Sequence, residues 1–137
     1  SGRFEKEYLA VVNGKYTEGG TINKPIYRPD PIKTYRTVDE RGDYAVTHYM
    51  PVEWGEDYTV VRVRLETGRT HQIRVHFASE GTPLYGDTMY GEAYGDYNHQ
   101  ALHCGKVKFV HPISGEEIEC VADMPEDMQK LLEKLRK

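Results

Sequence analysis

The chain has 137 residues, of which 29% are charged and 38% hydrophobic, and its formal net charge is −4. This length fits one domain, and the composition excludes disordered and collagen-like chains. No apolar run approaches the roughly 18 residues that would suggest a membrane span. Two cysteines, Cys104 and Cys120, are too few for a disulfide framework. We therefore expect a cytoplasmic domain whose cysteines are reduced core thiols.

The distribution of charge is more informative than its sum. A net negative charge argues weakly against a nucleic-acid partner, because phosphate binding favours a basic surface. Basic side chains nevertheless crowd into one short stretch: Arg62, Arg64, Arg69, His71, Arg74 and His76. The acidic residues concentrate elsewhere, around residues 116–119 and 123–127. A local basic patch on an acidic protein is therefore compatible with the sequence.

Short β-forming segments fill the first half of the chain. Residues 7–12 are apolar and precede Asn13-Gly14, a tight-turn signal, so they predict a buried strand. Residues 21–28 predict a short strand, in which Pro25 favours an edge position. Residues 32–38 and 44–52 are also strand-like. Residues 58–66 give the clearest signal, because one face of that strand is apolar except for a threonine.

A helical period replaces this alternation from Thr70 onward. Ile73 and Phe77 share a helix face, Thr70 is the expected N-cap and Gly81 the stop, which predicts about three turns. Residues 83–91 predict a loop, and residues 101–110 and 117–122 predict a hairpin. A last helix with an apolar stripe begins near Pro125. Together these elements predict an α+β domain with a largely antiparallel sheet, one central helix and one C-terminal helix.

The segment richest in chemical groups is residues 67–76, Thr-Gly-Arg-Thr-His-Gln-Ile-Arg-Val-His. It leads from a strand into a helix, whose first N–H groups favour anions. Arg74 lies between Ile73 and Val75, so we expect it to be sheltered and to need an anionic partner. No carboxylate is close to it in sequence, so the partner comes from elsewhere in the fold or from a ligand. The alternative is a structural salt bridge beside a solvated helix face.

Other residues leave two interpretations open. Tyr8 is either a core tyrosine with a satisfied hydroxyl or an aromatic platform for a base drawn out of its helix. His99, His103 and His111, with Cys104, could form a metal cluster, but their spacing matches no zinc pattern. No dinucleotide, phosphate-loop or metalloprotease motif occurs either. We expect neither a metal nor a cofactor.

A longer pattern resembles the signature of the RluA-type RNA pseudouridine synthases. It consists of residues 65–76, then Gly81, Pro83, Gly86-Asp87 and Tyr90-Gly91. Similar segments at residues 6–10, 20–26, 45–49 and 100–112 extend the resemblance over nearly the whole chain. It implies part of the pseudouridine synthase fold and an isomerase that needs no metal or cofactor. Such enzymes break the bond from ribose to the uracil nitrogen and rejoin the base through carbon.

The resemblance also implies residue roles. Tyr8 would stack on the target uracil, and Leu102 would form a wall of the uracil pocket. Arg74 would pair with the catalytic aspartate and lower its pKa. Arg69 and His71 would contact RNA phosphates.

The catalytic aspartate itself is missing. In this family it belongs to an Arg-Leu-Asp motif, which occurs nowhere in the 137 residues, and Asp87 is not its equivalent. We therefore expect residues 1–137 to be a single, incomplete domain that is inactive alone. We also expect Arg74→Ala to cost this chain far less stability than the complete enzyme. The apolar faces of residues 7–12 and 58–65 would be uncovered, which favours self-association.

Three functional hypotheses follow. The chain is part of a pseudouridine synthase acting on structured ribosomal or transfer RNA, with the target uridine flipped out. Alternatively it is a non-catalytic RNA-binding relative, or a metal-dependent enzyme built on His99, His103 and His111.

Overall fold

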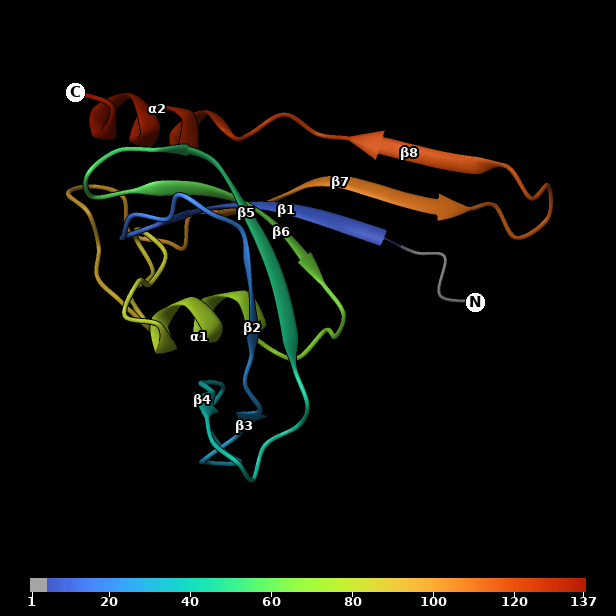
Figure 1. Ribbon diagram of the computed structural model, residues 1–137, viewed down its shortest axis with the longest axis horizontal. Helices are drawn as coiled ribbons and strands as arrows, with labels where there is room; N and C mark the ends of the chain where they lie inside the picture. Colours follow the sequence, from blue (N-terminus) through green and yellow to red (C-terminus); the bar gives the residue numbers. More distant parts are fainter. Residues whose placement is uncertain (1–4) are drawn as a thin grey trace.

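The computed structural model describes residues 5–137 as a twisted antiparallel sheet with one helix on each face (Figure 1). The strands are β1 (Glu5–Val12), β2 (Gly20–Asn23), β3 (Ile26–Tyr27), β4 (Thr37–Val38), β5 (Val46–Trp54), β6 (Thr59–Leu65), β7 (Leu102–Val110) and β8 (Glu117–Val121). Six of them form the main sheet in the order β2-β5-β6-β1-β7-β8, and β3 pairs with β4 separately. Every one of these strand pairs is antiparallel, which confirms the expected α+β domain with a largely antiparallel sheet.

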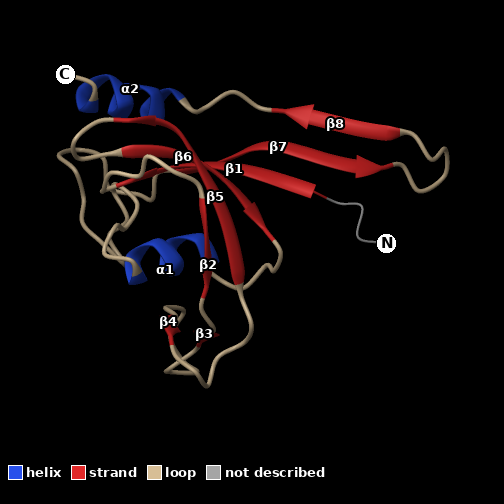
Figure 2. Ribbon diagram, viewed as in Figure 1, coloured by secondary structure: helices blue, strands red, loops and turns tan. Residues whose placement is uncertain are grey.

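The two helices, α1 (Gln72–Ser79) and α2 (Glu126–Leu135), cover opposite faces of the sheet (Figure 2). Side-chain alternation along the central strands produces two cores. In β1, Ala10 packs in the cluster that contains Phe77 of α1, whereas the adjacent Val11 packs in the cluster that contains Leu131 of α2. Among residues 5–137, neither helix has the length and apolar character needed to cross a membrane.

Most expected elements are confirmed, but the strand expected at residues 32–38 is wrong except for β4. Ile32 is 89% exposed, and its backbone N–H donates to the Asp30 carboxylate in a turn. An apolar residue that meets no partner strand has no surface to pack on, so strand propensity alone does not decide its conformation. The strand expected at residues 21–28 is interrupted at Lys24-Pro25, between β2 and β3. The expected edge position holds for β2, which is an outer strand of the main sheet.

The start of the central helix also differs from the expectation. α1 has 8 residues, about two turns, and its N-cap is His71 in the left-handed region at φ 57°, not Thr70. The buried Gln72 side chain organises this start instead. Its amide oxygen accepts from the Thr67 hydroxyl and the Arg69 N–H, and its amide nitrogen donates to the carbonyl of Val46.

The expectation of uncovered apolar faces on the first and sixth strands is wrong. Val11, Val60 and Val63 are at most 3% exposed, because α1 and α2 already cover these strands. Half-buried residues occur instead throughout β7, which extends with β8 and the start of β1 beyond both helices (Figure 1). The cysteines lie there and are not core thiols, since Cys104 is half-buried and Cys120 is exposed.

Candidate functional site

One open cavity of about 330 Å³ is lined by all five residues to which the family resemblance gives a role, Tyr8, Arg69, His71, Arg74 and Leu102. Its lining consists of Tyr8, Leu65, Arg69, His71, Gln72, Ile73, Arg74, Gln100 and Leu102. The strands β1, β6 and β7 supply one side and the start of α1 the other. Since β1 lies between β6 and β7, the sheet topology brings Tyr8 beside residues far along the chain.

Tyr8 combines an anchored backbone with an available ring. Its backbone lies opposite Val63 on β6 and Cys104 on β7, so its position is fixed from both sides. The ring is half-buried against the α1-side core, and its hydroxyl makes no hydrogen bond to any of residues 5–137. Burial raises the pKa of the Tyr8 hydroxyl, and the charge of Cys104 adds to this, so the hydroxyl is protonated at neutral pH.

Arg74 finds its partner in Asp87, thirteen positions further along the chain. Arg74 Nε donates to Oδ2 at 2.8 Å and Nη2 donates to Oδ1 at 2.9 Å, a two-pronged pair. The Arg74 side chain is 12% exposed and that of Asp87 is 0% exposed. Burial raises the pKa of Asp87, but hydrogen bonds from Arg74 and from the N–H groups of Tyr90 and Met89 outweigh it and lower the pKa overall. The chain therefore contains the salt bridge of the structural alternative, but not its solvated helix face, since most residues of α1 are buried.

His71 is held by Tyr90. The Tyr90 hydroxyl accepts from the Arg36 N–H at 2.7 Å, so its own hydrogen is available to His71 Nδ1 at 2.9 Å. Burial lowers the pKa of His71, and the charges of Arg74 and Arg36 lower it further. The ring is therefore neutral at neutral pH, and it offers a hydrogen-bonding group rather than a positive charge.

Arg69 and Leu102 complete the expected set. Arg69 Nε donates to the carbonyl of Tyr44 at 2.8 Å, which fixes its direction while the side chain stays exposed. Leu102 is half-buried and packs against the α1-side core. Gln72 and Gln100 also line the cavity, and no expectation from the sequence included them, although Gln72 lies within the motif at residues 65–76.

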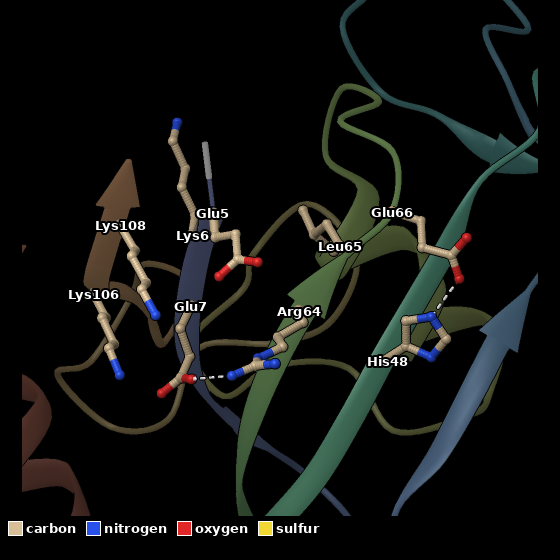
Figure 3. Close-up of a pocket in the computed structure, with 9 residues that line it drawn as sticks. All are labelled: Glu5, Lys6, Glu7, His48, Arg64, Leu65, Glu66, Lys106 and Lys108. Atoms are coloured by element: carbon tan, nitrogen blue, oxygen red, sulfur yellow. Dashed lines mark hydrogen bonds and ion pairs between the residues drawn. The ribbon is translucent and has the colours of Figure 1, made fainter. Parts of the chain in front are cut away.

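A second cavity, of about 240 Å³, contains none of the expected residues (Figure 3). It lies where the start of β1 separates from the end of β6, and charged side chains line it. Several are already paired: Glu7 contacts Arg64 at 3.6 Å, and His48 contacts Glu66. Because these side chains already pair with one another, the second cavity offers no argument for a catalytic site.

The three histidines proposed for a metal enzyme do not come together. His99 contacts Asp127, His103 contacts the carbonyl of Ala122, and His111 accepts from backbone N–H groups of its own turn. Within residues 5–137, no three histidine, cysteine or acidic side chains are grouped to hold a metal ion.

Comparison with known proteins agrees with the motif. A family model described as RNA pseudouridylate synthase matches residues 1–79. The ribosomal large subunit pseudouridine synthase D of Vibrio cholerae is 45% identical, over 96% of this chain and 45% of that protein. The uncharacterized RNA pseudouridine synthase YlyB of Bacillus subtilis is 48% identical, over 96% of this chain and 44% of that protein. The chain thus spans slightly less than half the length of these relatives.

Solved structures support the same fold. The human RNA pseudouridylate synthase domain containing 1 superposes with a TM-score of 0.74 at 25% identity, over 98% of this chain and 66% of that one. The human RNA pseudouridylate synthase domain containing 4 superposes with a TM-score of 0.78 at 21% identity, over 97% of this chain and 62% of that one. At this identity the likeness supports the fold alone. By sequence and by fold, the chain belongs to the RluA-type family of RNA pseudouridine synthases.

Proposed function

We propose that the protein containing this chain converts uridine to pseudouridine in RNA, and that this chain supplies one wall of the active site. The observation that carries the proposal is the single cavity that unites Tyr8, Leu102 and Arg74. An aromatic ring and an apolar wall suit a flat base, and a guanidinium beside them suits a carboxylate. The catalytic aspartate would come from protein outside these 137 residues.

Each residue has a distinct role in this proposal. Tyr8 stacks on the uracil, and its protonated hydroxyl can exchange a proton with the base. Arg74 lowers the pKa of the aspartate, so the carboxylate is ionised when it acts on the nucleotide. The bond from ribose to nitrogen breaks, the base turns, and a bond from ribose to carbon forms. The proton on that carbon leaves and the freed nitrogen gains one, so the reaction is an isomerisation.

The substrate must present its base in the cavity. A uridine inside a helix cannot reach a half-buried tyrosine, so we propose a structured RNA with the target uridine flipped out. Arg69, exposed at the rim, is placed to contact a neighbouring phosphate. Large-subunit ribosomal RNA is the first choice because the Vibrio cholerae relative is named for that subunit, and transfer RNA is the second. The proposed compartment is the cytoplasm, in keeping with two unpaired cysteines.

A tritium-release assay on RNA labelled at uracil carbon 5 tests the proposal. The complete protein should release tritium, whereas residues 1–137 alone should release none, because neither Tyr8 nor Arg74 can replace the carboxylate. Turnover by the isolated chain would contradict the assignment of an external aspartate. The absence of the Arg-Leu-Asp motif here keeps the binding-module alternative open. That alternative predicts RNA binding by the complete protein without tritium release.

A further inference from the structure

The loop that carries Asp87 is built around a position that admits only glycine. Gly86 has φ +77°, and a Cβ there would lie 2.2 Å from the carbonyl oxygen of His99. The turn that follows is closed by the Gly91 N–H, which donates to the Asp87 carbonyl at 2.7 Å. These constraints fix the backbone on both sides of Asp87, so the direction of its carboxylate is fixed as well.

Arg74 and the backbone of the turn each donate two hydrogen bonds to this carboxylate. Oδ1 accepts from the N–H groups of Met89 and Tyr90, both at 3.1 Å, and from Arg74 Nη2. Oδ2 accepts from Arg74 Nε. The Tyr90 ring lies against the guanidinium, with its centroid 5.2 Å from the Arg74 Cζ atom. The loop therefore holds Arg74 by one edge and by one face.

The other edge of the guanidinium remains available. Arg74 Nη1 donates to none of the residues that the structure describes. None of these residues has a buried side-chain nitrogen or oxygen without a partner, so Nη1 is not fully buried, and Arg74 is one of the residues that line the cavity. Two N–H bonds at this edge, from Nη1 and Nη2, can receive a second carboxylate.

We propose that Asp87 is a positioning residue. It binds the Nε–Nη2 edge of the Arg74 guanidinium, so that the Nη1–Nη2 edge meets the catalytic carboxylate at a fixed angle. This inference rests on the proposed function. The guanidinium is planar, so fixing one edge fixes the other. Arg74 is thus oriented before RNA or the aspartate arrives.

A double-mutant cycle on the complete protein tests this role. Asp87→Asn should lower kcat about 100-fold, because a catalytic group displaced by about 1 Å, here the Arg74 guanidinium, costs roughly that factor. KM should change little. In an Arg74→Lys background the same substitution should lower kcat by less than about threefold, because lysine has no planar fork to orient. Rates are normalised to the fraction of enzyme that binds RNA, which removes any loss caused by misfolding.

Glu53→Gln is the matched control. Glu53 accepts two hydrogen bonds of 2.7 Å from Arg136, the same two-pronged geometry away from the cavity, so its substitution should leave kcat unchanged. If Asp87→Asn does not fold, Asp87→Ser replaces it, since serine can still accept the turn N–H bonds, and the same loss is expected.

Three outcomes overturn the proposal. In the first, the wild type is active and the fold losses in kcat caused by Asp87→Asn and by Arg74→Lys multiply in the double variant. This outcome overturns the positioning role of Asp87 but not the proposed function. The same holds if Asp87→Asn keeps kcat within about threefold of the wild type. A complete wild-type protein that releases no tritium overturns the proposed function and, with it, the role of Asp87.

Discussion

Arg74 and Asp87 neutralise each other's charge in a largely buried environment. Either charge alone would be costly where the pair lies, since the arginine side chain is 12% exposed and the aspartate 0%. The expectation that this chain could lose Arg74 cheaply, because the catalytic aspartate is absent, therefore does not follow. The chain supplies its own carboxylate, and that carboxylate needs the arginine.

Arg74→Ala in residues 1–137 should lower the free energy of unfolding by about 3–5 kcal/mol at pH 7, the cost of removing one partner of a buried pair. Arg74→Lys should lower it less, and in the complete protein it should restore folding better than the rate of the proposed reaction. Urea unfolding monitored by circular dichroism measures the effect in the chain.

The same pair gives a pH signature. Because the pKa of folded Asp87 is lowered, its contribution to stability is present above the unfolded value of about 3.9 and is lost as pH falls through the folded pKa. The stability difference between wild type and Arg74→Ala should therefore shrink below about pH 4. A difference that does not depend on pH would show that the ion pair contributes nothing.

His76 should make stability depend on pH near neutrality. Its Nδ1 accepts from the Thr47 hydroxyl at 2.7 Å and its Nε2 donates to the Lys24 carbonyl at 2.8 Å. Burial lowers the pKa of His76, and the bond to Lys24 only partly opposes it. The neutral ring thus adds stability above the unfolded pKa of about 6.5, and this is lost as pH falls through the folded pKa.

His76→Gln removes the titrating group and keeps an amide that can donate and accept. Between about pH 7 and 5 the wild type should lose more stability than the variant. His71, whose pKa is also lowered, acts in both proteins and cancels in the comparison. Parallel pH profiles of the two proteins would contradict the role of His76.

At the scale of elements, a loop rather than a helix or strand holds the site together. Residues 84–91 connect the core to the ion pair, since Leu84 is 1% exposed and packs in the α1-side cluster. Tyr90 contacts both His71 and the Arg36 N–H, so the loop also joins α1 to the segment before β4. A change in its backbone should therefore affect Arg74 and His71 together.

Gly86→Ala and Gly81→Ala form a matched pair that tests this loop. Both glycines have a similar positive φ, +77° and +81°, so alanine costs about 1–2 kcal/mol of backbone strain at each. A Cβ at Gly86 also meets the His99 carbonyl at 2.2 Å, whereas one at Gly81 meets nothing within 4 Å. Thermal melts should show a much larger loss for Gly86→Ala. Equal losses would mean that the close approach to His99 has no effect.

At the scale of the whole molecule, one part of the sheet is covered by helices and another part is not. The helices cover the centre of the sheet, whereas β7 and β8 extend beyond them, and β8 is an outer strand (Figure 1). Val121 on β8 is 73% exposed, although Glu117 and Glu119 on the same strand oppose edge pairing by their charge. Any self-association of this chain should therefore involve β8.

We expect the isolated chain to self-associate at high concentration and Val121→Lys to reduce it, because a lysine on an outer strand disfavours pairing between chains. Ile32→Lys is the control, since Ile32 is 89% exposed in a turn away from the open edge. Sedimentation velocity over a range of concentrations measures both. A strictly monomeric wild-type chain with a sharp melt would contradict the expectation.

The sequence by itself determined the local conformations and the family. Alternation in residues 58–66 predicts β6, and the helical period after Thr70 predicts α1, because such patterns reflect which side of one element is buried. It misplaced the N-cap, which contacts with another element decide, and the strand at residues 32–38, where the exposed Ile32 has no partner strand to pack on. Gln72 replaces Thr70 at the helix start through contacts with β5.

Only the tertiary structure decided which residues meet. Tyr8 reaches the cavity because β1 lies between β6 and β7, an order that no local pattern encodes. Asp87 becomes the partner of Arg74 because a positive φ at Gly86 turns the chain back toward α1. A buried charge must find an opposite charge, so the sequence could require a partner for Arg74. Which carboxylate it is depends on the path of the backbone, and only the fold sets that path.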